Sequence, residues 1–154
     1  MSVDSERKLQ NKVKHWLIDD LGYIFLGNLD DRYNTPVKEE LLIANLKKRG
    51  YKPEQITKAV AELRSRVSNQ ADNLYTVNKA VYALLRYGLQ GVKDDAGHRN
   101  TVHYIDWTDA GNNDFYVAEE VTVLRYDRTT TKRPDLVLYV NGIALGMFEL
   151  KRSC

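Results

Sequence analysis

The chain has 154 residues, of which 43% are hydrophobic and 29% are charged, and its formal net charge at pH 7 is +2. This length suffices for one domain with a substantial core, and the composition is that of an ordinary globular protein. The small net charge does not identify a nucleic-acid-binding protein, so such a function must be argued from local clusters of charge. No apolar run approaches the roughly 20 residues that span a bilayer, and the polar N-terminus does not resemble a signal peptide.

Residues that mark disulfide, zinc or nucleotide sites are sparse. The single cysteine, Cys154, cannot form an internal disulfide, which fits a reducing cytoplasm. The three histidines have no zinc-ligand spacing with the cysteine or with one another. The chain also lacks the Gly-x-x-x-x-Gly-Lys-Ser/Thr sequence of a P-loop. We therefore expect a cytoplasmic protein that holds neither zinc nor, through a P-loop, ATP.

The first half of the chain has the hydrophobic periodicity of helices. Each predicted helix begins at a capping residue or a proline, or ends before a glycine, because these residues suit helix ends. The predicted helices run from Asp4 or Ser5 to Gly22, from Thr35-Pro36 to Gly50, from Pro53 to about Val67, and from about Val77 to Tyr87, before Gly88.

The second half has the composition of strands, which are separated by turn residues. The predicted strands are Leu89–Lys93, Thr101–Trp107, a long strand Phe115–Arg125, and two apolar strands on either side of Asn141-Gly142. The polar stretch 127–132 is predicted to be a loop. Helices followed by strands indicate an α/β fold, with a mixed sheet flanked by helices and a mostly helical N-terminal half. We see no internal boundary and expect a single domain over residues 1–154.

Two carboxylates and a lysine stand at the ends of the last two apolar strands. Asp135 begins the first strand, and Glu149 and Lys151 follow the second. Carboxylates hold Mg²⁺, a metal ion can lower the pKa of a bound water, and a lysine can hold that water or neutralise a phosphate. These are the components of metal-assisted phosphodiester cleavage. The alternative is that the two strands simply leave the core here, since Glu-x-Lys is common and recurs at Glu6-Arg7-Lys8.

The turn at Asn141-Gly142 decides whether the two carboxylates share a face of the sheet. A two-residue turn in a regular hairpin would pair Asp135 with Phe148 and so point Asp135 away from Glu149. A three-residue loop with Gly142 in a bulge would instead place Asp135 opposite Met147, on the same face as Glu149. We predict the three-residue loop, because it brings both carboxylates to one cation.

A cluster of basic residues precedes the first carboxylate. The cluster comprises Arg125, Arg128, Lys132 and Arg133. One interpretation is a loop that follows the DNA backbone beside the metal site, where each phosphate contact makes binding dependent on salt. The other interpretation is a solvated loop between strands.

The spacing of these residues resembles a known family. Pro134-Asp135, thirteen intervening residues and Glu149-Leu150-Lys151 resemble the signature of the PD-(D/E)XK nuclease superfamily. Further blocks, in order, resemble the N-terminal endonuclease domain of the restriction (R) subunit of type I restriction-modification enzymes. These blocks are Ser5-Glu6, Gln10-Asn11, Leu21-Gly22-Tyr23, Asn78–Tyr82, Leu85–Gly88, Ile105–Trp107, Asn113–Phe115 and Arg133–Gly142.

The resemblance implies an endonuclease domain that cuts double-stranded DNA with Mg²⁺. In the family an ATP-driven DNA translocase follows this domain, and the R subunit joins methylation and specificity subunits. By resemblance Asp135 and Glu149 would hold the metal and Lys151 would be the catalytic lysine. Glu6 is the candidate for an additional carboxylate from the first helix, with Gln10 as a weaker candidate, although the helix dipole also explains an acid there.

The resemblance also implies that the chain is part of a longer protein, with the motor domains after Cys154, and that the part can be inactive alone. Two other functions stay open. One is a non-catalytic module that keeps the fold and docks DNA or the motor domains. The other is the nuclease domain of a different helicase-coupled system.

Overall fold

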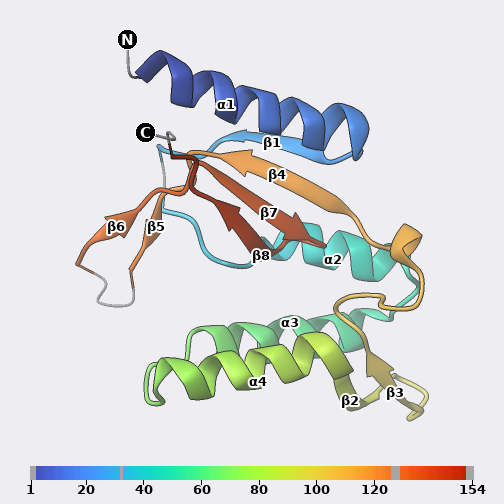
Figure 1. Ribbon diagram of the computed structural model, residues 1–154. Helices are drawn as coiled ribbons and strands as arrows, with labels where there is room; N and C mark the ends of the chain where they lie inside the picture. Colours follow the sequence, from blue (N-terminus) through green and yellow to red (C-terminus); the bar gives the residue numbers. More distant parts are fainter. Residues whose placement is uncertain (1–2, 32, 126–128, 152–154) are drawn as a thin grey trace. The chain divides into compact units, whose positions relative to one another are not determined.

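The computed structural model describes residues 3–31, 33–125 and 129–151. The chain packs as two compact units, which are described separately below. The first unit combines the residues up to Pro36 with those from Phe115 onward, and the second unit comprises Val37–Asp114 (Figure 1).

The first unit is built on a mixed four-stranded sheet. Its strands, in spatial order, are β1 (Ile24–Asn28), β4 (Phe115–Glu119), β7 (Leu136–Val140) and β8 (Ile143–Phe148). Strand β1 is parallel to β4, and the β4–β7 and β7–β8 pairs are antiparallel. This mixed sheet, with four α-helices in the described part of the chain, confirms the predicted α/β class and is consistent with a restriction-endonuclease-like fold. Strand β1 was not predicted.

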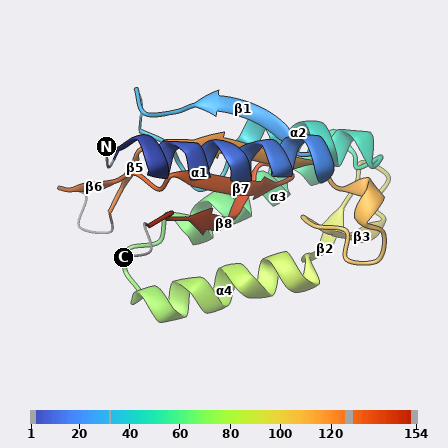
Figure 2. The same cartoon turned by 45° about the horizontal axis from the view of Figure 1, so that its top comes forward.

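One face of the sheet is covered by α1 (Val3–His15), which continues as a short π-helix, Trp16–Asp20. Figures 1 and 2 both show α1 lying across the strands. The core between them contains Leu17, Val117 and Leu136, all buried. The predicted helix is confirmed up to its end near Gly22, where φ is +73°. Its apolar residues Leu9, Val13, Leu17 and Leu21 recur every four residues. Leu9 and Leu21 are exposed, because a strict four-residue repeat drifts around a helix of 3.6 residues per turn.

The predicted long strand Phe115–Arg125 is wrong. Strand β4 ends at Glu119, and Glu120 has a φ of +52°, in the left-handed region that turns the chain out of the sheet. The chain then forms β5 (Val123–Leu124), which pairs with β6 (Thr131–Lys132) as a separate two-stranded sheet. Part of the predicted 127–132 loop is therefore strand.

The second unit contains three helices, a hairpin and a short 3₁₀-helix. These are α2 (Glu39–Lys48), α3 (Pro53–Val67), α4 (Leu74–Tyr87), the strands β2 (Leu89–Lys93) and β3 (Arg99–Val102), and the 3₁₀-helix Ala110–Asn112. Buried leucines and Val102 form its core with Tyr104, whose hydroxyl donates to the carbonyl of Ala59 at 2.7 Å. No helix in the described ranges is long and apolar enough to cross a membrane.

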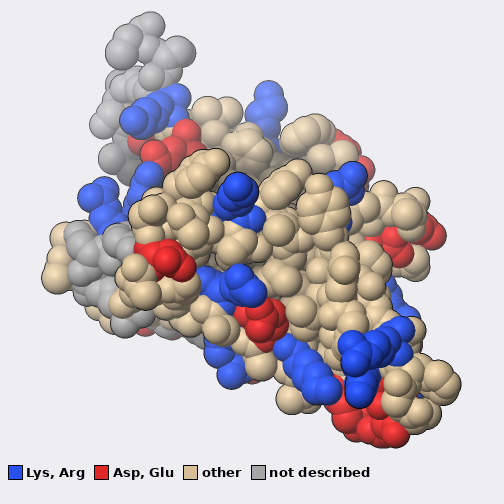
Figure 3. Space-filling model, turned by 90° about the horizontal axis from the view of Figure 1, so that it is seen from below, with Lys and Arg blue, Asp and Glu red and all other residues tan. Residues whose placement is uncertain are grey.

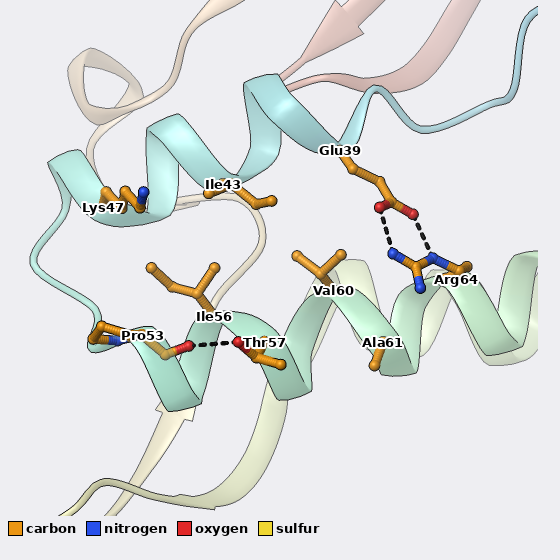
Figure 4. Close-up of a pocket in the computed structure, with 9 residues that line it drawn as sticks. All are labelled: Glu39, Ile43, Lys47, Pro53, Ile56, Thr57, Val60, Ala61 and Arg64. Carbon is orange, nitrogen blue, oxygen red and sulfur yellow. Dashed lines mark hydrogen bonds and ion pairs between the residues drawn. The ribbon is translucent and has the colours of Figure 1, made fainter.

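A pocket lies between α2 and α3 (Figure 4). Ile43, Ile56 and Val60 face it, and Arg64 donates two hydrogen bonds to Glu39 at one end (Figure 4). None of the predicted site residues lines this pocket.

Two predicted boundaries in this part of the chain need correction. The second helix begins at Glu39 instead of Pro36, and the carbonyl of Pro36 accepts a hydrogen bond from the backbone N–H of Ala144. The predicted strand Thr101–Trp107 ends at Val102. The residues after it form a loop around the side chain of Asp106, which accepts the backbone N–H groups of the two residues at 108 and 109. The predicted third helix and the strand Leu89–Lys93 are confirmed.

Candidate active site

The β7–β8 hairpin has a two-residue turn, so the predicted three-residue loop is wrong. Val140 pairs directly with Ile143, and the turn residues Asn141 and Gly142 have φ angles of +52° and +85°. Positive φ at both positions is the geometry of a type I′ turn, whose twist matches that of the flanking strands. Asn and Gly are the residues that tolerate it best.

A bulge farther along β8 shifts the register of the hairpin by one residue. Tyr139 pairs with Ala144, but Leu138 pairs with Gly146, so Leu145 is an extra residue in β8. Beyond the bulge Leu136 lies opposite Phe148, whose carbonyl also accepts the backbone N–H of Asp135 at 3.1 Å. Asp135 and Glu149 therefore lie at the same end of the hairpin, and the bulge is at Leu145 instead of the predicted Gly142.

The carboxylate of Asp135 is anchored on the end of β8. Asp135 is half-buried just before β7, and its Oδ2 accepts the backbone N–H of Leu150 at 2.6 Å. Its own backbone N–H donates to the carbonyl of Phe148 at 3.1 Å. The Asp135 carboxylate thus lies against the peptide that joins Glu149 to Leu150.

Glu149 and Lys151 lie on the exposed side of this strand end. Both are exposed, whereas Leu150 between them is half-buried, so the alternation of the strand continues past Phe148. Nζ of Lys132 lies 2.8 Å from Oε1 of Glu149. This hydrogen bond and the charge of Lys132, with a smaller contribution from the charge of Lys151, lower the pKa of Glu149 below its ordinary value. Glu149 is therefore ionised at neutral pH.

A polar network on the α1 side holds the backbone of Asp135. The Asp135 carbonyl accepts the backbone N–H of Glu120 at 3.0 Å and the side-chain amide of Gln10 at 3.3 Å. The carboxylate of Glu120 in turn accepts from Gln10 at 3.1 Å, Arg7 at 3.4 Å and Arg133 at 3.1 Å. The backbone of Asp135 is thus held by Gln10 of α1 and by Glu120 after β4, and Glu120 also binds Gln10.

Sequence reasoning missed Glu120 and gave Gln10 a different role. Gln10 was a weak candidate for the catalytic centre, whereas its buried amide contacts the backbone of Asp135. Glu120 was expected inside a long strand. The pair Glu119-Glu120 within an otherwise apolar segment was the signal that the strand ends there, because adjacent strand residues point to opposite faces.

Glu6 and Arg125, two other predicted site residues, both lie on the exposed surface. Glu6 is exposed on α1, and the residues that the structure describes contain no group of three His, Cys, Asp or Glu side chains that could hold a metal. The structure therefore does not bring Glu6 together with Asp135 and Glu149. Arg125 is exposed beside β5, and Arg128 lies outside the described residues.

Two members of the predicted DNA-contacting cluster are held by acidic residues. Lys132 pairs with Glu149, and Arg133 pairs with Glu120. Contact of this cluster with DNA stays a prediction.

The donor set of this site suits a hard divalent cation. Asp135 and Glu149 offer carboxylate oxygens at neighbouring strand ends, with no thiolate or imidazole among the site residues described above. Mg²⁺ is usually held by one or two carboxylates and completes its shell with water and substrate oxygens. The residues present therefore fit Mg²⁺ better than zinc, which prefers nitrogen and sulfur ligands in structural sites.

Comparison with known proteins assigns the family. The family model described as "Type I restriction enzyme R protein N terminus" matches residues 4–154. A Methanocaldococcus jannaschii protein, provisionally named as the endonuclease subunit of type I restriction enzyme MjaIXP, is 34% identical over 76 residues, which are 47% of this chain and 7% of that protein. No solved structure matches the chain. Since the family model covers nearly its whole length, the chain belongs to the family of type I restriction enzyme R protein N-terminal domains.

Proposed function

We propose that the chain is a DNA-cleaving domain of a type I restriction enzyme R subunit and hydrolyses phosphodiester bonds of double-stranded DNA with Mg²⁺. The observation that carries this proposal is the end of the β7–β8 hairpin, where the Asp135 carboxylate accepts the Leu150 N–H, next in the chain to the exposed Glu149.

Asp135 and Glu149 would hold the ion. When bound, Mg²⁺ stabilises negative charge that develops on the phosphate oxygens and lowers the pKa of a bound water. The Leu150 N–H orients the Asp135 carboxylate, and Lys132 keeps Glu149 ionised. Lys132 must leave Oε1 of Glu149 when a cation takes that oxygen, and its ammonium group is then available for a DNA phosphate.

Lys151 would act on the reacting groups directly. It follows Glu149 by two residues, so its side chain leaves the strand end on the same side. An ammonium group there can neutralise the phosphate or orient the attacking water. In the longer protein we expect ATP-driven motor domains after this domain, and methylation and specificity subunits as cytoplasmic partners.

Plasmid cleavage by the complete restriction complex tests the proposal. Asp135→Ala and Lys151→Ala should each reduce cutting by about 100-fold or more, while ATP hydrolysis and translocation stay normal. Lys12→Ala, which removes an exposed lysine of α1, is the matched control and should cut like the unmodified complex. Unimpaired cutting by either site variant would refute the assigned roles.

A second candidate function is a non-catalytic docking module with the same fold. The observation that favours it is the Lys132–Glu149 ion pair, which occupies one of the two expected ligands. Calorimetry with Mn²⁺ separates the two functions. A binding heat that Asp135→Ala abolishes supports the nuclease, and no heat in either protein supports the docking module.

A further inference from the structure

One face of α4 carries an unusual stripe of side chains. Tyr75, Lys79, Tyr82 and Arg86 follow one another at intervals of four, three and four residues, which places them on one side of the helix. All four are exposed, and Tyr75 and Tyr82 have relative accessibilities of 76% and 63%. We call these four residues the α4 stripe.

Trp107 extends the stripe at its C-terminal end. The guanidinium carbon of Arg86 lies 5.3 Å from the centre of the Trp107 ring, and the indole N–H donates to the carbonyl of Leu85 at 2.8 Å. The tryptophan is nevertheless 53% exposed. The arginine and the indole are thus held in place while both still face solvent.

The stripe is not the core-facing side of the helix. Val77 is buried, and Val81, Leu84 and Leu85 are half-buried on the other side, where α4 packs against α3. The exposed tyrosines are therefore not part of the core of this unit. Clustered exposed aromatic residues usually mark a binding surface.

The charge of α4 is entirely positive. The helix contains Lys79 and Arg86 and no Asp or Glu. In α3, by contrast, arginines pair with Glu39 and Glu62. Neither cation of α4 pairs with a carboxylate in the described part of the chain. Figure 3 shows blue side chains set in tan surface, several of them beside red ones.

We propose that the α4 stripe binds the phosphate backbone of duplex DNA. Lys and Arg neutralise phosphates, and tyrosine hydroxyls donate to phosphate oxygens without reading the sequence. The stripe belongs to the unit 37–114, whereas Asp135 and Glu149 belong to the other unit. The choice of DNA over another polyanion rests on the proposed function.

Binding of a fluorescent duplex to the full chain in EDTA tests the stripe without any cleavage. Lys79→Ala/Arg86→Ala should weaken binding about tenfold and reduce the slope of log K against log salt by about 2, because each phosphate contact contributes about 0.9. Lys12→Ala/Lys58→Ala removes two exposed lysines from α1 and α3 and should leave the slope unchanged. Circular dichroism checks that α4 persists, and Lys79→Gln/Arg86→Gln repeats the test with other helix-forming residues.

The outcomes separate this inference from the catalytic one. No cleavage occurs in EDTA, so the binding result does not depend on whether Asp135 and Lys151 have the assigned catalytic roles. Normal affinity and slope in both double variants would overturn the proposal. If those variants bind DNA normally but no longer assemble with the other subunits of the restriction complex, the stripe is a protein-docking surface and the proposal is also overturned.

Discussion

At the scale of single residues, the pair Lys132–Glu149 controls the charge of the site. Lys132 lowers the pKa of Glu149, so the carboxylate stays ionised to a lower pH than an ordinary glutamate. A lowered folded-state pKa contributes stability above the ordinary pKa, and this contribution is lost as the pH falls through the lowered value. Both side chains are about 40% exposed, at 42% and 41%, so the effect on folding is small.

Lys132→Ala should therefore act on the site more than on the fold. We expect the pKa of Glu149 to rise toward its ordinary value and Mg²⁺ to bind more tightly, because the cation no longer competes with an ammonium group. Carboxyl NMR titration and calorimetry measure the two effects. Lys8→Ala, an exposed lysine on α1, is the control. An unchanged Glu149 titration would contradict the ion pair.

Glu120 combines a backbone role with a side-chain role, and substitution can separate them. Its φ of +52° favours glycine, whereas its carboxylate holds Gln10 and Arg133 beside Asp135. Glu120→Gly should keep the stability but reduce Mg²⁺-dependent cleavage by roughly 10- to 100-fold, as for other residues that support metal ligands.

Glu120→Gln is the comparison for this prediction. The amide oxygen can still accept from Gln10, so the variant should retain more activity than Glu120→Gly. Equal activity of the two variants and the unmodified complex would show that Asp135 does not need this support.

At the scale of elements, the end of β8 holds the Asp135 carboxylate beside the residue that follows Glu149. Inserting an alanine between Phe148 and Glu149 should move the glutamate to the other face and abolish the Mn²⁺ binding heat. Deleting Leu145 should preserve binding, because a regular strand then gives the same pairing of Leu136 with Phe148. Calorimetry on the two variants tests the register, and binding by the insertion variant would contradict it.

The junction between α4 and β2 depends on a glycine. Gly88 has a φ of +78°, and a Cβ there would lie 2.7 Å from the carbonyl oxygen of Val102. Gly88→Ala should lower the free energy of unfolding by roughly 2–4 kcal/mol, from backbone strain and this clash. Gly50→Ala, at a φ of +86° with nothing within 4 Å, should cost only about 1 kcal/mol of strain. Urea unfolding measures both, and equal losses would exclude the clash.

These elements also show what the sequence could predict. Periodicity and the terminal residues Pro53 and Gly88 located helices correctly, because such signals are local. The type I′ turn is equally local in Asn141-Gly142, whereas the predicted three-residue loop rested on the requirement that both carboxylates reach one cation. The bulge at Leu145 has no marker in the sequence.

Long-range pairing explains the remaining errors. Strand β1 is short, and its partner β4 follows only after the whole second unit, so no local pattern reveals it. The left-handed Glu120 is held by contacts with Gln10 of α1 and with Asp135 just before β7, which are remote in sequence. The location of Asp135 and Glu149 at one end of the hairpin was predictable, whereas the support from Gln10 and Glu120 was not.

At the scale of the whole molecule, each unit has its own buried core and one tryptophan. Trp16 belongs to the first unit and Trp107 to the second. Trp16→Phe therefore leaves Trp107 as the fluorescent probe of the second unit, and Trp107→Phe leaves Trp16 as the probe of the first unit. If each core stabilises its own unit, Gly88→Ala should lower the urea midpoint reported by Trp107 and leave the midpoint reported by Trp16 nearly unchanged.

A substitution in the other core provides the reciprocal test. Leu136→Ala removes a fully buried side chain of the first unit and should cost roughly 2–5 kcal/mol there. We expect it to shift the Trp16 transition and to leave the Trp107 transition nearly unchanged. Equal shifts of both probes in both variants would mean that the two cores unfold as one cooperative unit, because a two-state transition gives every probe the same midpoint.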